Sequence, residues 1–233
     1  MLLRDNTESV LFHYGNVIDP ADAPVIDVME FSPDSRQLLW TGEGELHIVD
    51  LVRKDAPIRI FPMRGLTECS AWSPDGNTIV VGGQFDTLVE INLKTGVPRK
   101  ISHSGISTST IRFSHDGRRI ISGHFDGAVR FWGRSDASMK SIHQHRSAVR
   151  SIALSHNGRI GASADKEGNL AVWFADTGER IGRLRQQSMT TSYDLARPAL
   201  YFARHDTQFR ILFRDPEREL ALRTWDLKPI LPE

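Results

Sequence analysis

The 233-residue sequence lacks most of the features that would assign it to a specialised class of protein. Its one cysteine, Cys69, excludes an internal disulfide framework and a paired-cysteine metal site. No run approaches 18 apolar residues, and Asp5 and Glu8 interrupt the apolar start that a signal peptide needs. Basic and acidic residues balance at 29 each, so total charge indicates neither nucleic acid nor a membrane partner. We therefore expect a cytoplasmic protein without membrane contact.

Common catalytic and cofactor motifs are also absent. The sequence has no nucleophile elbow, no HExxH zinc motif, no P-loop and no dinucleotide-binding glycine pattern. The nine histidines do not combine with carboxylates or Cys69 at zinc-site spacing. We predict a protein that is not an enzyme and has no cofactor and no metal site. Its 39% hydrophobic content is nevertheless sufficient to build a core.

The sequence repeats a short pattern at a constant interval. An apolar residue is followed by serine, then proline or histidine, then aspartate or asparagine. The apolar residues are Phe31, Trp72, Phe113 and Leu154, each 41 residues after the one before, and a fifth step reaches Leu195. Equal steps with matching residue types indicate an internal structural repeat.

Each repeat has the pattern of four short strands. In the third repeat, alternating apolar residues and turn signals predict strands at 110–113, 119–122, 128–132 and 139–142. A single four-stranded sheet cannot bury both of its faces. Stacking each sheet on the next around an axis would bury them and protect most strand edges.

Three segments carry a resemblance to a known family: 113–117, 122–132 and 163–173. Their turn residues, and the tryptophan or Phe-Trp that ends the third strand, resemble WD40-repeat β-propellers. The resemblance covers residues 25–185 well and the remainder weakly. It implies an all-β fold, a β-propeller of four-stranded antiparallel blades. We expect one domain, 1–233, with five full blades and a partial N-terminal one. The expected boundaries are 1–24 for the partial blade, then 25–64, 65–105, 106–146, 147–187 and a divergent 188–229.

Both ends of the predicted propeller are irregular. Residues 2–4 and 10–14 resemble the last two strands of a blade, so we expect the sequence to begin within one. Three arrangements remain open: a five-bladed ring, an open arc completed by another chain or a second copy, and a portion of a longer polypeptide. Because unpaired strand edges are aggregation templates unless covered, we favour the incomplete ring with a partner.

The fifth blade has two alternative registers. The 41-residue interval predicts strands at 193–195, 200–203, 209–213 and 220–225. It then places Trp225 on the fourth strand, although Trp225-Asp226 looks like the signature dipeptide of the third. The alternative places the dipeptide on the third strand and requires an insertion of 11 residues. We favour the first register.

The family resemblance also implies a buried hydrogen-bond set in each blade, made of histidine, serine or threonine, aspartate and tryptophan. A half-buried imidazole and indole N–H both need partners. Glu167 takes the aspartate place in blade four, and His103 is one residue out of phase in blade three. The eight members are His103, Ser122, Asp126, Trp132, His145, Ser163, Glu167 and Trp173. In blades one and two, Val49 and Ile91 replace tryptophan, so we expect more reliance on apolar packing.

Two features suggest where a partner binds. Phe85 and Phe125 each precede a turn aspartate, on the rim that resembles the family's binding face. Each ring is either a binding hot spot or packing between blades. The candidate partner-binding residues are Arg64, Phe85, His124, Phe125, Arg146 and Lys166. Charge is also divided along the chain: residues 1–98 carry a net charge of −8 and residues 99–185 carry +8.

Three functions remain to be compared. The resemblance implies a non-catalytic protein–protein interaction scaffold within a heteromeric assembly or a longer chain. The alternative is a nucleic-acid-contacting subunit that uses the basic sector of blades three and four. An enzyme with an acid–base pair drawn from His124, Asp126 and Glu167 is the third. The six arginines of the basic sector are Arg112, Arg118, Arg119, Arg130, Arg150 and Arg159.

Overall fold

The computed structural model describes residues 26–53, 55–63, 65, 67–84, 87–103, 105–136, 138–185, 199–202, 208–214 and 220–226. These residues form 19 β-strands and no helix. The predicted all-β class is therefore confirmed. Nothing in these ranges forms a helix long and apolar enough to span a lipid bilayer. The strands expected at 2–4 and 10–14 lie outside them.

Sixteen of the strands form four antiparallel sheets, each containing four strands in sequence order. The first sheet contains β1 (Val28–Phe31), β2 (Gln37–Gly42), β3 (Glu45–Asp50) and β4 (Arg59–Pro62). The second contains β5 (Thr67–Trp72), β6 (Thr78–Gly83), β7 (Thr87–Asn92) and β8 (Pro98–His103). The third contains β9 (Thr108–Phe113), β10 (Arg119–His124), β11 (Ala128–Gly133) and β12 (Met139–His143). The fourth contains β13 (Val149–Leu154), β14 (Ile160–Asp165), β15 (Asn169–Phe174) and β16 (Arg180–Arg185).

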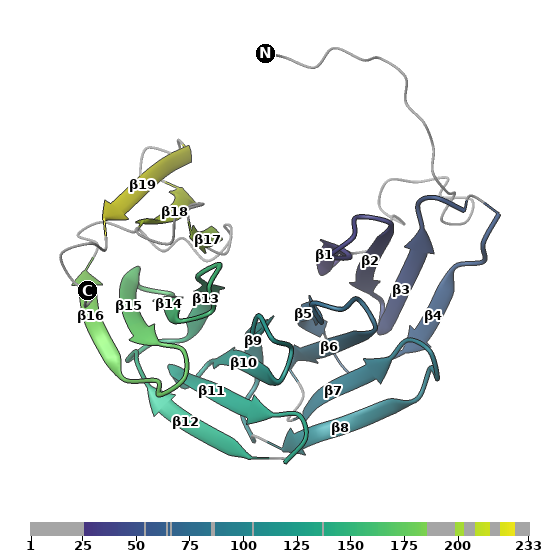
Figure 1. The fold of residues 1–233 in the computed structure, drawn as a ribbon, viewed down its shortest axis with the longest axis horizontal. Helices are drawn as coiled ribbons and strands as arrows, with labels where there is room; N and C mark the ends of the chain where they lie inside the picture. The colour runs from purple at the N-terminus through teal and green to yellow at the C-terminus, as the bar shows by residue number, and fades with distance from the viewer. Residues whose placement is uncertain are drawn as a thin grey trace, which may run out of the picture.

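The described sheets follow one another along an arc, with the first strand of each sheet on the concave side (Figure 1). Successive first strands contact one another, from β1 to β5, β9 and β13. The 41-residue interval has a direct structural meaning. Phe31, Trp72, Phe113 and Leu154 are the last residues of the four first strands. The four sheets have the arrangement of propeller blades and are called blades 1 to 4 below.

The serine and aspartate of the repeated pattern close the turn between the first and second strands. In blade 2, the Ser73 Oγ donates to Asp75 and accepts the Thr78 N–H at 3.0 Å. The Asp75 carboxylate accepts the Asn77 N–H at 3.0 Å, and these bonds lower the pKa of Asp75 to about 2. Equivalent serine–aspartate or serine–asparagine bonds occur in the other three blades. The repeat is therefore retained because it satisfies the polar groups of a tight turn.

The last turn residue takes a left-handed conformation in every blade. Gly76, Gly117 and Gly158 have φ between 67° and 70°. Blade 1 has Ser35 at this place, with φ of 58°. A side chain is disfavoured in this region because its Cβ approaches the following carbonyl oxygen. Blade 1 thus carries local backbone strain that the other blades avoid.

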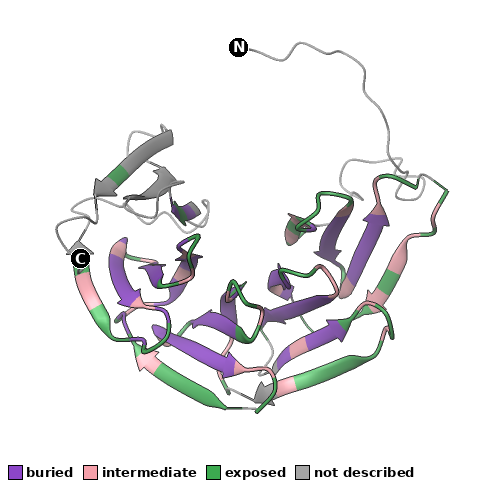
Figure 2. Cartoon of the chain, viewed as in Figure 1, coloured by how far each residue is buried: buried purple, intermediate pink, exposed green. Residues whose placement is uncertain are grey.

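The hydrophobic core consists of layers between neighbouring blades. Trp72 of blade 2 packs with Leu39 and Leu46 of blade 1, and Phe113 of blade 3 packs with Cys69 and others from blade 2. Two further layers join blades 3 and 4, and blade 4 with β17 (Ala199–Phe202). Except on β1, burial is greatest on the inner and middle strands, and it is smallest on β8 and β12 (Figure 2). Each blade therefore depends on its neighbours to bury its faces.

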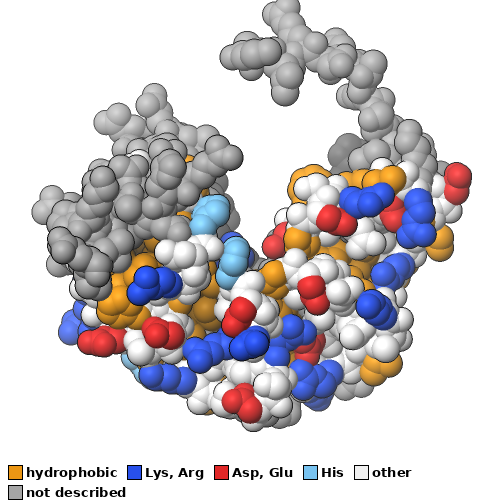
Figure 3. Space-filling model, viewed as in Figure 1, with side chains coloured by type: hydrophobic (Ala, Val, Ile, Leu, Met, Phe, Trp, Pro, Cys, Tyr) orange, Lys and Arg blue, Asp and Glu red, His pale blue; other side chains and the backbone are white. Residues whose placement is uncertain are grey.

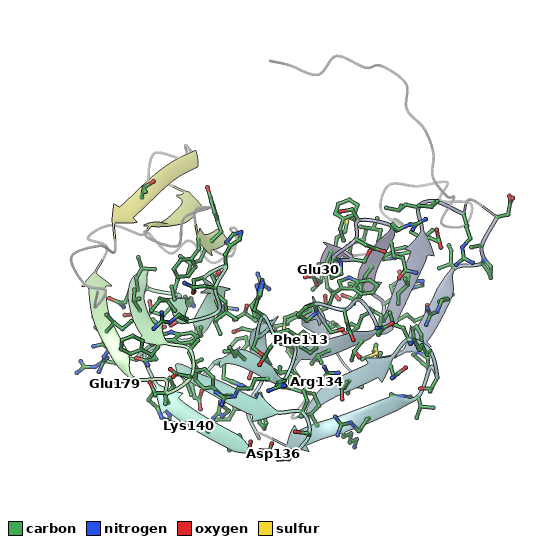
Figure 4. The ribbon with its side chains drawn as sticks, in the orientation of Figure 1. Glu30, Phe113, Arg134, Asp136, Lys140 and Glu179 are labelled. Atoms are coloured by element: carbon green, nitrogen blue, oxygen red, sulfur yellow. The ribbon has the colours of Figure 1, made fainter. Side chains whose placement is uncertain are left out.

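The junction of blades 2 and 3 has an ion pair in addition to its apolar layer. The buried Glu90 on β7 accepts hydrogen bonds from Arg99 and from Arg134, whose Nε lies 2.8 Å from Oε1. The Arg134 guanidinium also lies 5.2 Å from the centre of the Phe113 ring (Figure 4). Its other nitrogens donate to Gly117 and Thr78.

The equivalent positions in the repeat are apolar elsewhere. Ile48 and Leu93 belong to the layer between blades 1 and 2, and Phe131 and Ala175 belong to the layer between blades 3 and 4. Glu90 and Arg134 thus form an ion pair that is specific to the junction of blades 2 and 3.

The last sheet contains the strands predicted at 200–203, 209–213 and 220–225, but each takes an earlier place in the blade than predicted. The strand predicted at 193–195 lies outside the described residues. The sheet contains three described strands, β17, β18 (Gln208–Arg214) and β19 (Leu220–Asp226). β17 contacts β13, as β13 contacts β9, so β17 takes the first place of its sheet. β19 is then the third strand, and Trp225 lies on it opposite Phe209. The structure supports the longer insertion, because the chain before β17 is longer than the 41-residue interval allows.

Candidate interaction site

A buried hydrogen-bond chain joins the middle strands of blade 3. The Trp132 Nε1–H donates to Ser122 Oγ at 2.7 Å, and this oxygen lies 2.7 Å from His124 Nε2. His124 Nδ1 lies 3.3 Å from the Ile106 carbonyl oxygen. Burial, together with the nearby Arg130 charge, lowers the pKa of His124 to about 4. A neutral ring can accept from the serine and donate to the carbonyl, which satisfies every polar atom of the chain.

Blade 4 builds the same chain with a histidine from a different segment. The Trp173 Nε1–H donates to Ser163 Oγ at 3.2 Å, and His145 Nε2 lies 2.8 Å from that oxygen. His145 Nδ1 lies 3.3 Å from the Asp165 carboxylate. A Cβ at Gly161 would lie 2.1 Å from the Trp173 ring, so glycine is needed beside the indole. Blade 4 therefore completes a four-residue chain.

The carboxylates of the predicted hydrogen-bond set occupy other places. Asp126 lies outside the chain, with its Oδ2 2.6 Å from Arg130 Nη2, while Glu167 is exposed. The carboxylate that meets His145 belongs to Asp165, which is one interval of 41 residues after His124. Burial opposes ionisation of Asp165, but hydrogen bonds from His145 and Asn169 outweigh it and lower its pKa. Glu167 occupies the turn position equivalent to Asp126, whereas Asp165 is the last residue of β14, where its carboxylate reaches His145.

The remaining predicted members give a mixed outcome. The side chain of His103 lies outside the described part of the structure. His124, predicted on the binding rim, is fully buried and bonded to Ser122 instead. Its position at the end of β10 turns the ring inward, which removes it from the accessible surface.

Phe125 lies in the turn after β10 and is 36% exposed. The Arg150 guanidinium of β13 lies 4.8 Å from the centre of its ring. Arg150 Nη1 is also 4.0 Å from Glu68 on β5, so one arginine faces both an aromatic ring and an acid. The sequence left two roles open for Phe125, packing between blades and binding a partner. The geometry combines them, because the ring contacts Arg150 of the neighbouring blade and is also partly exposed to solvent.

Backbone contacts bring the turns of blades 3 and 4 together. The His145 N–H donates to the Gly127 carbonyl at 3.2 Å, and the Lys166 N–H donates to the Ala148 carbonyl at 2.8 Å. The loop between β12 and β13 therefore links the turn of Phe125 to the turn of Lys166. Arg146, which is exposed, lies in this loop. We call Phe125, Arg146, Arg150 and Lys166 the Phe125 surface.

Two of the predicted binding residues, Arg64 and Phe85, lie outside the described residues. Arg150 was missed as a member of this surface, although it was counted in the basic sector. Its signal in the sequence is its position near the start of a first strand, where the repeat places Glu68 and Ser109 in the preceding blades. A small residue in the intervening blade leaves room for the arginine to reach the acid.

The six arginines of the predicted basic sector divide into two groups of three. Arg130 is buried and paired with Asp126, while Arg150 faces Phe125 and Glu68, and the Arg112 charge acts on Glu30. Arg118, Arg119 and Arg159 are exposed. Lys and Arg side chains form a row over the sheet of β9–β12 in Figure 3. Much of the sector's positive charge is therefore used inside the protein or between its blades.

Catalytic and metal-binding arrangements are not supported by the described geometry. His124 bonds to Ser122, Asp126 pairs with Arg130, and the exposed Glu167 belongs to a different blade. These three candidates for acid–base chemistry are therefore not assembled into one site. Across the ranges that the structure describes, no three His, Cys, Asp or Glu side chains are grouped as ligands for a metal ion.

Comparison with known proteins agrees with this geometry. Residues 96–133 and 137–173 match the family model "WD domain, G-beta repeat". These segments contain β10–β11 and β14–β15, and thus both tryptophan–serine pairs. The chain therefore contains two WD40 repeats, at 96–133 and 137–173, and its four-stranded antiparallel sheets are consistent with the blades of a β-propeller.

Several curated proteins are similar to part of the chain. UBP9-binding protein bun62 of Schizosaccharomyces pombe is 35% identical over 128 residues, covering 51% of this chain and 23% of that protein. Serine-threonine kinase receptor-associated protein of Dictyostelium discoideum is 29% identical over 109 residues, covering 46% and 36%. Small ribosomal subunit protein RACK1y of Oryza sativa subsp. japonica is 27% identical over 124 residues, covering 52% and 36%. The matches therefore span about a quarter to a third of these relatives.

Proposed function

We propose that this WD40-repeat chain is a non-catalytic scaffold that holds protein partners in a larger cytoplasmic assembly. The single observation that carries the proposal is the Phe125 surface. There a partly exposed aromatic ring contacts an arginine, and the loop of Arg146 and the turn of Lys166 are joined to its turn by backbone hydrogen bonds. Aromatic and arginine side chains are enriched among residues that dominate binding energy at protein interfaces.

Rigidity of the surrounding blades supports the proposal. The Phe125 turn begins one residue after His124, whose ring is fixed by the buried chain with Ser122 and Trp132. The Lys166 turn begins one residue after Asp165, which is fixed by His145. A surface held in this way loses little conformational entropy when it binds. The printed names of relatives, such as UBP9-binding protein and receptor-associated protein, also describe association with other proteins.

The nucleic-acid alternative has weaker support. Three of the six arginines that suggested it contact or act on acidic or aromatic groups within the protein. Binding through phosphates would require many free cations and would weaken steeply with salt. We therefore expect binding of total cellular RNA to be weak and lost at moderate salt.

The test is capture of partners from the protein's own cells by the tagged chain, read by native mass spectrometry. Phe125→Ala should remove a bound protein species that the wild-type chain retains, while the free energy of unfolding changes by less than about 1 kcal/mol. The matched control is Met139→Ala, because Met139 is 51% exposed on β12, away from the Phe125 surface. Retention of every species by Phe125→Ala, or equal losses from both variants, would contradict the proposal.

A further inference from the structure

Arg150 is a mostly buried arginine whose side chain donates no hydrogen bond to any other described residue. The side chain is 26% exposed. The other buried or half-buried arginines whose side chains are described are Arg59, Arg130 and Arg134, and each donates to a carbonyl or carboxylate oxygen. A guanidinium carries five N–H donors, and donors left unpaired away from water are costly. Arg150 therefore retains unused donors for an acceptor that a ligand brings.

Two contacts set the direction of this guanidinium. Arg150 lies on β13, and its Cζ lies over the Phe125 ring, 4.8 Å from the ring centre. Its Nη1 is 4.0 Å from Glu68 Oε2 on β5, which is beyond the roughly 2.7–2.9 Å of a charge-assisted hydrogen bond. Ser109 has the same place in the blade between them, and its hydroxyl donates to the Gly123 carbonyl at 3.0 Å. Stacking on the ring thus orients the guanidinium plane and leaves the N–H groups along its edge for a ligand.

These unused donors determine the chemistry of the ligand. A guanidinium matches a carboxylate or a phosphate through two parallel N–H···O bonds. Glu68, at 4.0 Å from Arg150, would repel a phosphate with two negative charges about twice as strongly as a carboxylate with one. The Asp126 carboxylate, in the same turn as Phe125, is already paired with Arg130 at 2.6 Å. The balance of one cation against one anion therefore favours a carboxylate, and the partly exposed Phe125 ring offers an apolar contact beside it.

We propose that Arg150 binds an aspartate or glutamate side chain of the partner protein, next to an apolar partner residue that covers Phe125, and that Glu68 competes with this carboxylate for the guanidinium. The partner's carboxylate accepts two hydrogen bonds from Arg150. Glu68 holds the arginine in place in the free protein and lowers its affinity for the acidic segment. This site rests on the proposed scaffold function, because it names the chemistry that the Phe125 surface recognises.

The test measures binding of a defined acidic probe to the full chain by fluorescence anisotropy. The probe is a fluorescein-labelled random copolymer of glutamate and tyrosine, which supplies carboxylates beside aromatic rings. The matching copolymer of lysine and tyrosine is the control probe. We expect the glutamate copolymer to bind at least about tenfold more tightly, because only its charge complements Arg150.

Substitutions of Arg150 test the guanidinium itself. Arg150→Gln should weaken binding of the glutamate copolymer by about tenfold. Arg150→Lys should weaken it nearly as much, because an ammonium group lacks the planar fork. The matched control is Arg180→Gln, which removes an exposed positive charge at the start of β16 and should leave binding unchanged. Circular dichroism of each variant should match that of the wild type.

Glu68→Gln tests the competition. Removal of this carboxylate should strengthen binding of the glutamate copolymer by about threefold, because Arg150 then meets no internal anion. A gain in affinity cannot come from misfolding, and a merely structural role of Glu68 would produce none.

Several outcomes would overturn the proposal. They are unchanged or weaker binding in Glu68→Gln, equal losses in Arg150→Gln and Arg180→Gln, full binding in Arg150→Lys, and equal binding of the two copolymers. Displacement of the probe by inorganic phosphate more readily than by acetate, at equal ionic strength, would also overturn it.

Capture of partners from cells separates this inference from the proposed function. If Phe125→Ala loses a captured protein while the glutamate copolymer does not bind the wild-type chain, the carboxylate site alone is contradicted. If the copolymer binds through Arg150 while Phe125→Ala retains every captured protein, the proposed function alone is contradicted.

Discussion

Blades 3 and 4 are held together internally by polar chains, whereas blades 1 and 2 are held by apolar packing. Trp132 and Trp173 donate to buried serines in the former pair. In blade 2, Ile91 takes the tryptophan place and is 1% exposed within an apolar layer. In blade 1, the Trp40 and His47 rings stack with centroids 4.9 Å apart.

The comparison shows that the same blade backbone can form around either a buried hydrogen-bond chain or an apolar core. All four blades have the same strand order and the same serine-based turn. A polar chain fixes ring orientations because each polar atom needs its partner, and a gap in the chain is costly. Apolar packing depends on shape and tolerates substitution more readily. We therefore expect the turns of blades 3 and 4, which include Phe125 and Lys166, to be held more rigidly than those of blades 1 and 2.

The largest expected effect comes from breaking the polar chain of blade 4. Trp173→Ala removes a fully buried indole and leaves Ser163 and His145 beside a cavity. We expect a loss of about 3–5 kcal/mol in the free energy of unfolding, measured by urea denaturation. Trp173→Phe, which keeps most of the packing, should cost about 1–2 kcal/mol. Equal losses from both variants would show that the hydrogen bond, and not the packing, dominates.

A somewhat smaller effect should appear as a pH dependence specific to blade 3. The folded pKa of His124 is lowered to about 4 from 6.5, so the unfolded chain binds its proton at a higher pH than the folded chain does. Stability should therefore be fully present above pH 6.5 and fall as pH decreases toward 4, by roughly 3 kcal/mol in total.

Thermal unfolding across this pH range measures that contribution. The stability of His124→Gln relative to the wild type should rise as pH decreases from 6.5 to 4, a difference that removes the opposing contribution of Glu30, whose pKa burial raises to about 7. His115→Gln, at an exposed turn, should show no such change relative to the wild type. An unchanged slope in His124→Gln would mean that the buried imidazole is not the group that titrates.

The smallest expected effect concerns the strained turn of blade 1. Ser35→Gly places a glycine where blades 2 to 4 have one, at φ of 58°. Glycine relieves the left-handed strain at this position, but it also gives the unfolded chain more conformational entropy. The net result should be a free energy of unfolding that is higher by about 0.5–1 kcal/mol. The reciprocal change Gly76→Ser should lower it by a similar amount. If Ser35→Gly destabilises the protein, a contact of the serine outweighs the strain.

The repeat made most of the fold predictable from the sequence. A regular interval marked the last residue of each first strand, and turn residues marked the strand ends. The register of the last sheet was wrong because an insertion before β17 leaves no periodic signal. The Trp225-Asp226 dipeptide matched the pattern of a third strand and indicated the correct place. The 41-residue interval indicated the fourth strand and was given more weight.

The candidate site was predictable only in outline. Phe125 and Lys166 could be placed near each other because equivalent turns of neighbouring blades share one end of the sheets. The contact of Arg150 with Phe125 depends on side-chain reach between blades, which a single sequence does not encode as a pattern. The inward position of His124 depends on a neighbouring hydroxyl at Ser122, and the exchange of Glu167 for Asp165 depends on turn geometry.

The pairing of Glu90 with Arg134 has a consequence for how this gene can change. Repeats of equal length invite duplication, deletion or reordering by recombination. Any event that separates the second repeat from the third would remove Arg134 from the buried Glu90 and leave Arg99, whose side chain is 55% exposed, as its ion-pair partner. Loss of one partner of a buried carboxylate lowers stability. Blades 2 and 3 are therefore expected to be inherited as a single unit, while the other borders remain open to exchange.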